Sequence, residues 1–137
     1  MTAASDSPVE VTLTSDSDVV RVRQVVRDAA TAAALTLVDQ TKVITAASEI
    51  ARNTLTYGGG GTSTVEVVCR NGTQGVAVEF VDAGPGIHDV DLALTDGWTS
   101  GTGLGLGLSG AKRLVDEFAL DTTPGVGTTV RITKWRR

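Results

Sequence analysis

The stretch DGWTSGTGLGLGLSG, residues 96–110, places glycine at alternate positions from Gly101 to Gly107 and leads into an apolar-patterned segment, residues 111–118. Glycine costs backbone entropy, so such a run usually serves the close approach of a ligand. Backbone N–H groups at the start of the helix predicted there can face an anion. The run therefore predicts a phosphate-binding loop. An unliganded surface loop is the alternative, because a glycine pattern alone is weak evidence.

The composition fits one compact domain covering residues 1–137, because a chain of 137 residues with 41% hydrophobic content can bury a core but is short for two domains. The first eight residues are predicted to be disordered. A formal net charge of −4 disfavours a nucleic-acid-binding surface, which needs clustered Lys and Arg. We therefore expect no nucleic-acid partner.

The sequence also bears on compartment. It contains no apolar run of about 18 residues, and its first residues lack the basic start and apolar core of a signal peptide. We expect a cytoplasmic protein without a membrane segment. The single cysteine, Cys69, allows no internal disulfide and is predicted to be a buried thiol.

Apolar periodicity predicts an alternation of helices and strands along the chain. Strands are predicted at 9–13, 64–70, 75–81, 120–123 and 128–135. Helices are predicted from Ser15 or Asp16 to before Asp39, from about Asp39 to Tyr57, at 88–94, and from Ser109 or Gly110 to Phe118. Asn71-Gly72 predicts a hairpin with a polar loop longer than two residues. The four glycines at 58–61 are interpreted as a linker that ends the second helix.

Two polar side chains of the second predicted helix lie four residues apart. Glu49 and Asn53 therefore share one face, one turn apart, where both could reach one ligand. An ordinary solvated helix face remains the alternative interpretation.

A carboxylate follows directly on the strand predicted at 75–81. Asp82 precedes Gly84 and Gly86, a pattern in which the carboxylate can accept a hydrogen bond in a pocket while the backbone folds tightly around a ligand. A simple Asp-Gly turn is the alternative.

The ordered set of these features resembles the Bergerat-type ATP-binding superfamily of gyrase, Hsp90, histidine kinases and MutL, from about Val9 to Trp135. It comprises Glu49-x-x-x-Asn53, Asp82-x-Gly84-x-Gly86, the glycine-rich stretch as a lid, and Gly125-x-Gly127-Thr128. The resemblance implies an α+β fold, a two-layer sandwich with a mixed, mostly antiparallel sheet covered by helices on one face. Within the superfamily, VDQTKVITAASEIARN, GLGLGLSGAKRLVDEF and the ending VRITKWRR look like the RsbT-like switch kinases of the stressosome. The anti-sigma factor kinases are relatives of that group.

The resemblance implies roles for individual residues. Asn53 would ligate Mg²⁺ through its amide oxygen, and Glu49 would act as general base on a substrate hydroxyl. Asp82 would accept the adenine amino group, and Thr128 would close the adenine end. The remaining ATP-binding positions are Gly84, Gly86 and Ile87 behind the base, and Gly101, Gly103, Leu104, Gly105, Leu106 and Gly107 in the lid.

The implied function is an ATP- and Mg²⁺-dependent protein serine/threonine kinase. It would phosphorylate STAS-domain proteins of the stressosome and, once released, bind and activate a PP2C-type phosphatase. An anti-sigma factor that sequesters a sigma subunit and a non-catalytic ATP-binding adaptor are the alternatives. Glu49 favours catalysis, because an adaptor needs no base there.

Two details qualify the resemblance. No Lys or Arg lies between Arg70 and Lys112, so the lid lacks a cation for the γ-phosphate, and we expect slow turnover without a partner. His88 is expected to be a solvated loop residue rather than a phosphoacceptor, because the chain has no accompanying dimerisation helices.

Overall fold

The computed structural model describes residues 7–87, 94 and 107–137, which form a five-stranded sheet and three helices. The strands are β1 (Val9–Leu13), β2 (Gly61–Arg70), β3 (Thr73–Asp82), β4 (Glu117–Thr123) and β5 (Gly127–Trp135). The helices are α1 (Asp16–Ala32), α2 (Leu37–Thr56) and α4 (Leu108–Leu114). The strand order is β1-β2-β3-β5-β4, and every described pair is antiparallel. The α+β sandwich is confirmed, while the parallel pair that a mixed sheet requires is not among these strands.

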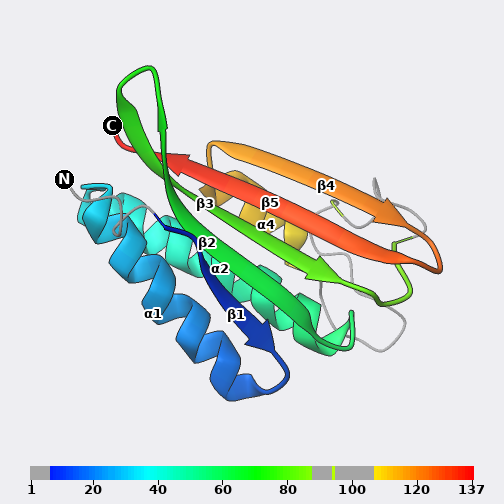
Figure 1. The fold of residues 1–137 in the computed structure, drawn as a ribbon. Helices are drawn as coiled ribbons and strands as arrows, with labels where there is room; N and C mark the ends of the chain where they lie inside the picture. Colours follow the sequence, from blue (N-terminus) through cyan, green and yellow to red (C-terminus); the bar gives the residue numbers. More distant parts are fainter. Residues whose placement is uncertain (1–6, 88–93, 95–106) are drawn as a thin grey trace.

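The helices cover one face of the sheet (Figure 1). Helices α1 and α2 pack against each other, and α4 packs against α2. The core between the layers is built from valines and alanines of α1 and α2 and from inward residues of the strands, with Leu13, Phe80 and Ile132 almost fully buried. None of the helices in the described part of the chain is long and apolar enough to cross a membrane.

Helix α2 begins two residues before the predicted start. The Asp39 amide donates to the Thr36 hydroxyl at 3.1 Å, which makes Thr36 the N-cap. Threonine at that position satisfies an N–H group that has no partner within the helix. The cap therefore places Leu37 and Val38 in the first turn.

The β2–β3 hairpin turns more tightly than predicted. Arg70 pairs with Thr73, so the loop is only Asn71-Gly72, and both residues have positive φ, 53° and 82°. That geometry belongs to a two-residue type I′ turn, and the longer loop predicted from the polar residues was wrong. Cys69, one pair from the strand end, is exposed rather than buried. The hairpin tip extends past the helices, which leaves that end of the strands without a cover (Figure 1).

The last predicted helix was too long. Helix α4 ends at Leu114, and the residues from Glu117 form β4 rather than a helical turn. Phe118 and Leu120 pair with Ile132 and Val130 of β5, where alternation turns them toward the core. The apolar spacing at the end of the predicted helix belonged to a strand.

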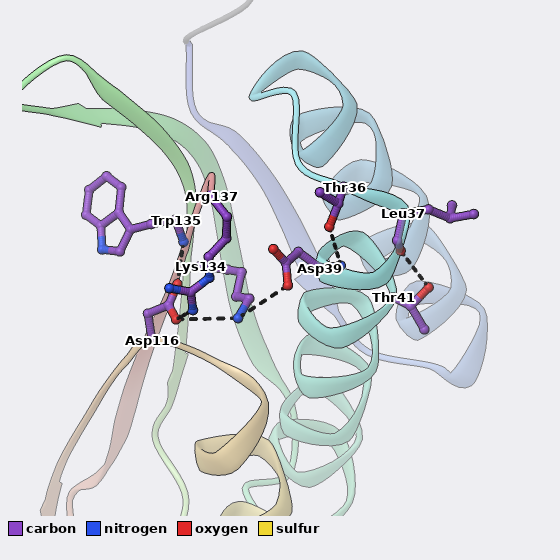
Figure 2. A network of polar contacts seen from close by, with 8 residues as sticks. All are labelled: Thr36, Leu37, Asp39, Thr41, Asp116, Lys134, Trp135 and Arg137. Atoms are coloured by element: carbon purple, nitrogen blue, oxygen red, sulfur yellow. Dashed lines mark hydrogen bonds and ion pairs between the residues drawn. The ribbon is translucent and has the colours of Figure 1, made fainter.

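A buried lysine ties the C-terminal end of β5 to both layers (Figure 2). The Lys134 ammonium lies 3.6 Å from an Asp39 oxygen and 3.4 Å from an Asp116 oxygen. Asp116 also accepts a hydrogen bond from the Trp135 amide at 2.7 Å and pairs with Arg137. These contacts hold the start of α2, the α4–β4 connection and the end of β5 together.

Candidate functional site

A pocket opens at the other end of the sheet, where the end of α2 meets the end of β3 and the start of β5. Its empty volume is about 320 Å³, counting its open mouth. The lining residues are Ile50, Asn53, Thr54, Tyr57, Asp82, Ile87, Leu108, Thr128 and Val130. The walls are mostly apolar, with a few polar groups among them.

Asp82 is the carboxylate of this pocket. Its Oδ1 accepts a hydrogen bond from the Gly84 amide at 2.9 Å, which closes a tight turn. Asp82 thus forms the turn predicted as the alternative and also lines the pocket. No described residue donates to Oδ2. An ionised carboxylate only accepts hydrogen bonds, so this oxygen favours a donor on a ligand.

The glycines that follow α2 shape the position of Asp82. A Cβ at Gly58 would lie 2.5 Å from the Asp82 Cγ, and one at Gly61 would overlap the Val81 carbonyl. By contrast, a Cβ at Gly59 would meet no atom within 4 Å. The linker interpretation is therefore wrong for Gly58 and Gly61, which let β3 and the end of α2 approach closely.

Gly84 and Gly86 stand behind the pocket and do not line it. A Cβ at Gly84 would lie 2.7 Å from the Gly58 backbone, and one at Gly86 would lie 2.6 Å from the Thr123 carbonyl oxygen. Contacts within the protein thus already require glycine at both positions. Their predicted contact with a nucleotide stays a prediction.

Asn53 reaches the pocket from α2. Its Nδ2 is buried and has no hydrogen-bond partner among the residues that the structure describes. A buried amide without a partner carries a desolvation penalty, which a ligand can relieve. Because an amide nitrogen donates, this wall of the pocket suits a ligand that carries a hydrogen-bond acceptor.

Glu49 lies one helical turn before Asn53 on α2, next to Gly107, the residue before α4. A Cβ at Gly107 would lie 2.7 Å from Glu49 Oε2, and Gly107 has a φ of 66°. Glu49 Oε1 accepts a hydrogen bond from Arg52 at 3.1 Å, and the Glu49 side chain is 44% exposed. The carboxylate is therefore accessible from solvent beside the pocket.

Most of the predicted lid lies outside the described residues. This applies to Gly101, Gly103, Leu104, Gly105 and Leu106, and also to the helix predicted at 88–94 except for Leu94, and to His88. Of the lid, Gly107 lies next to Glu49, and Leu108, which begins α4, lines the pocket.

The structure brings four predicted binding residues, Asn53, Asp82, Ile87 and Thr128, into this one pocket. Sequence reasoning missed Ile50, Thr54, Tyr57, Leu108 and Val130. Three of these were within reach, because Ile50, Asn53, Thr54 and Tyr57 follow helical spacing and lie on one face of α2.

The histidine kinase-like ATPase domain family matches residues 4–134 of this chain. The chain belongs to this family. The serine/threonine-protein kinase RsbT of Bacillus subtilis is 40% identical over 93% of this chain and 96% of its own length. The chain is thus an RsbT-like serine/threonine kinase within the histidine kinase-like ATPases, which confirms the resemblance. ATP use follows from this membership.

Other similarities are more partial. An anti-sigma F factor of Caldanaerobacter subterraneus is 35% identical over 44% of this chain and 44% of its own length. The crystal structure of the SiaB-SiaC complex from Pseudomonas aeruginosa contains a chain with a TM-score of 0.53 and 15% identity, covering 94% of this chain and 89% of that one. The latter similarity concerns the fold.

Proposed function

We propose that this kinase uses Mg²⁺ and ATP to phosphorylate a serine or threonine of a STAS-domain protein in a bacterial stress-response partner switch, in the cytoplasm. Once released from that partner, it would bind and activate a PP2C-type phosphatase. The proposed kinase activity is supported mainly by the relative positions of four side chains. Asp82, Asn53 and Thr128 line a single pocket, and the accessible carboxylate of Glu49 lies one helical turn from Asn53.

The adenine would occupy the pocket. Ile50, Leu108 and Val130 supply apolar walls for a flat ring, and Asp82 offers an acceptor for the exocyclic amino group. The pocket is open on one side, so the phosphates would extend out of it, toward Asn53 and Glu49.

Asn53 would hold Mg²⁺ through its amide oxygen. The buried atom without a partner among the described residues is Nδ2, a hydrogen-bond donor that suits an acceptor on the nucleotide. The Mg²⁺ role rests on the other amide atom, an oxygen of the kind that Mg²⁺ prefers. Within the described residues, no group of three His, Cys, Asp or Glu side chains could hold a metal ion. At a nucleotide, water and phosphate oxygens usually complete the Mg²⁺ shell. The ion would supply charge neutralisation at the phosphates.

Glu49 would act as general base. An oxygen of the substrate hydroxyl forms a bond to the γ-phosphorus, the bond to the bridging oxygen breaks, ADP leaves, and the hydroxyl proton passes to Glu49. Arg52 holds this carboxylate only through a half-exposed ion pair, and such pairs contribute about 0–1 kcal/mol. A docking substrate can therefore displace Arg52 and leave it to face the phosphates.

The kinase activity and the anti-sigma alternative differ in what they require of Glu49. The partial similarity to an anti-sigma F factor supports a sigma-binding role as a second candidate. A sequestering protein needs nucleotide binding but no base, whereas Glu49 lies accessible beside the pocket. This position favours transfer.

The test combines purified kinase with candidate STAS-domain proteins, Mg²⁺ and labelled ATP. Glu49→Gln should abolish transfer and leave nucleotide affinity unchanged, because the base does not hold the ground-state nucleotide. Asp82→Asn should weaken binding about ten- to hundredfold, since hydrogen bonds to charged groups are worth about 1.5–3 kcal/mol. Glu79→Gln, on the sheet face away from the pocket, is the matched control and should change neither.

Two results would contradict the proposal. Loss of nucleotide binding in Glu49→Gln would remove the base assignment. ATP hydrolysis by the isolated chain as fast as with its substrate would remove the expectation that the partner completes the site.

A further inference from the structure

The hydroxyl of Thr122, on β4, connects two residues of the nucleotide pocket without lining it. The Ile87 amide donates to Thr122 Oγ1 at 2.9 Å, and the hydroxyls of Thr122 and Thr128 lie 2.9 Å apart. Thr122 also donates to the Gly127 carbonyl at 3.2 Å. Thr122 and Thr128 are direct partners in the β4–β5 ladder. Thr122 thus contacts the pocket wall from behind.

A hydroxyl has one proton and two lone pairs, which limits how these contacts combine. If Thr122 donates to Gly127, its lone pairs accept from the Ile87 amide and from the Thr128 hydroxyl, and all three contacts are hydrogen bonds. If Thr122 instead donates to Thr128, the contact with Gly127 is lost. The first arrangement satisfies more groups and is favoured, because unpaired buried polar groups are costly.

This arrangement decides what Thr128 presents to a ligand. With its proton directed to Thr122, the Thr128 oxygen offers lone pairs to the pocket. Asp82, which pairs with Thr128 in the β3–β5 ladder, is also an acceptor when ionised. Both groups then match the exocyclic amino group of adenine and oppose the carbonyl oxygen that guanine and hypoxanthine carry at that place.

We infer that Thr122 is a positioning residue that fixes the Thr128 hydroxyl as an acceptor and so sets the preference for adenine over 6-oxopurines. This inference rests on the proposed ATP site. Thr122 does not touch the nucleotide and acts through Thr128 and Ile87.

The experiment measures the affinities of ADP and IDP for the wild-type chain and its variants. These two nucleotides differ at the amino group in question. Thr122→Val should lower the ADP:IDP affinity ratio about tenfold, the factor expected for one hydrogen bond in the wrong orientation. Thr122→Ser should keep the wild-type ratio. Thr129→Val, on the opposite face of β5, is the matched control and should also keep it.

A double-mutant cycle separates positioning from a general structural role. Thr128→Val should lower the ratio as Thr122→Val does, and the double variant should lower it no further, because both changes remove the same acceptor. Additive losses would overturn the inference, as would a Thr122→Val variant with an unchanged ratio. If Thr122→Val is too unstable to measure, Thr122→Cys, a weak hydrogen-bonding group of similar size, takes its place with the same expected loss.

Failure of the inference differs from failure of the proposed site. A wild-type chain that binds neither ADP nor IDP would contradict the ATP site itself. A wild-type chain that prefers ADP, with a Thr122→Val variant that prefers it equally, would contradict only the role of Thr122.

Discussion

The two ends of β5 differ in whether the polar groups around them are paired within the protein. At the C-terminal end, Lys134 is only 4% exposed, and its ammonium lies between the carboxylates of Asp39 and Asp116. At the N-terminal end, Thr128 lines the pocket in which Asn53 Nδ2 has no partner within the described part of the chain. The polar groups at the C-terminal end of β5 are therefore paired within the protein, whereas the pocket at its N-terminal end has a polar atom that a ligand can pair with.

At the same C-terminal end of β5, further polar contacts lie on the outer face of the sheet. Arg70 lies over the Trp135 ring at 4.6 Å and pairs with Glu117 at 2.6 Å, and the Trp135 indole donates to the same carboxylate. Polar groups satisfied within the protein fix the strands against each other, whereas groups without a partner are available to a ligand. We therefore expect substitutions at the C-terminal end to change stability and substitutions at the N-terminal end to change the proposed nucleotide binding.

The largest effect is expected from removing the buried cation. Lys134→Met leaves Asp39 and Asp116 without their shared partner and should lower the free energy of unfolding by about 3 kcal/mol, the lower end of what breaking a buried ion pair costs. Denaturant unfolding measures this, and the affinity of the folded variant for ADP should stay unchanged.

Arg131→Met is the matched control for that variant. Arg131 pairs with Glu66 at 3.5 Å on the exposed sheet face, where such a pair contributes less than about 1 kcal/mol. Equal losses in the two variants would contradict the special role of the buried cluster. A parallel loss of ADP affinity in Lys134→Met would show that the two ends are coupled.

An intermediate effect is expected at the pocket end. A Cβ at Gly58 would press on the Asp82 carboxylate, so Gly58→Ala should weaken ADP binding about tenfold, the equivalent of about 1.4 kcal/mol. Gly59→Ala is the control: Gly59 has a φ of 77° but open space around it. Its strain should reduce stability without reducing affinity. Calorimetric titration distinguishes the two, and equal affinities would contradict the role of Gly58.

The smallest effect concerns acid stability. Burial alone raises the pKa of Asp116, but the Trp135 amide and the charges of Lys134 and Arg137 outweigh it and hold that pKa below the ordinary 3.8. The stabilisation by the ionised carboxylate is thus complete above pH 3.8 and is lost as the pH falls through the lowered pKa. Asp116→Asn should therefore be less stable than wild type at neutral pH, with the gap narrowing in acid.

The control for the acid profile is Asp121→Asn, an exposed carboxylate on the neighbouring strand. Unfolding curves from pH 2 to 7, a range of about five units around the ordinary carboxyl pKa, compare the three proteins. A gap between wild type and Asp116→Asn that is constant across this range would contradict the assignment.

The sequence named four of the residues that line the pocket, while several of its element boundaries were wrong. Helical spacing put Glu49 and Asn53 on one face, and the family resemblance implied that Asp82 contacts the same ligand. The sequence misjudged Phe118, because its apolar spacing fits both a helix and a strand over a short segment. It also misjudged Cys69, because burial at a strand end depends on whether a helix lies above it.

By itself, the sequence determined the order of helices and strands, because periodicity and turn residues are local properties of the chain. The α+β fold and the shared site of Asn53, Asp82 and Thr128 were implied by the family resemblance that its motifs carry. Only the tertiary structure decided which side chains from different helices and strands contact one another. Lys134, two residues from an exposed Arg136, is buried because α2 and the α4–β4 connection bring it two carboxylates. Gly58 and Thr122 shape the pocket through contacts 24 and 6 positions away in sequence, with Asp82 and Thr128. Such contacts depend on how the layers pack, which no local pattern records.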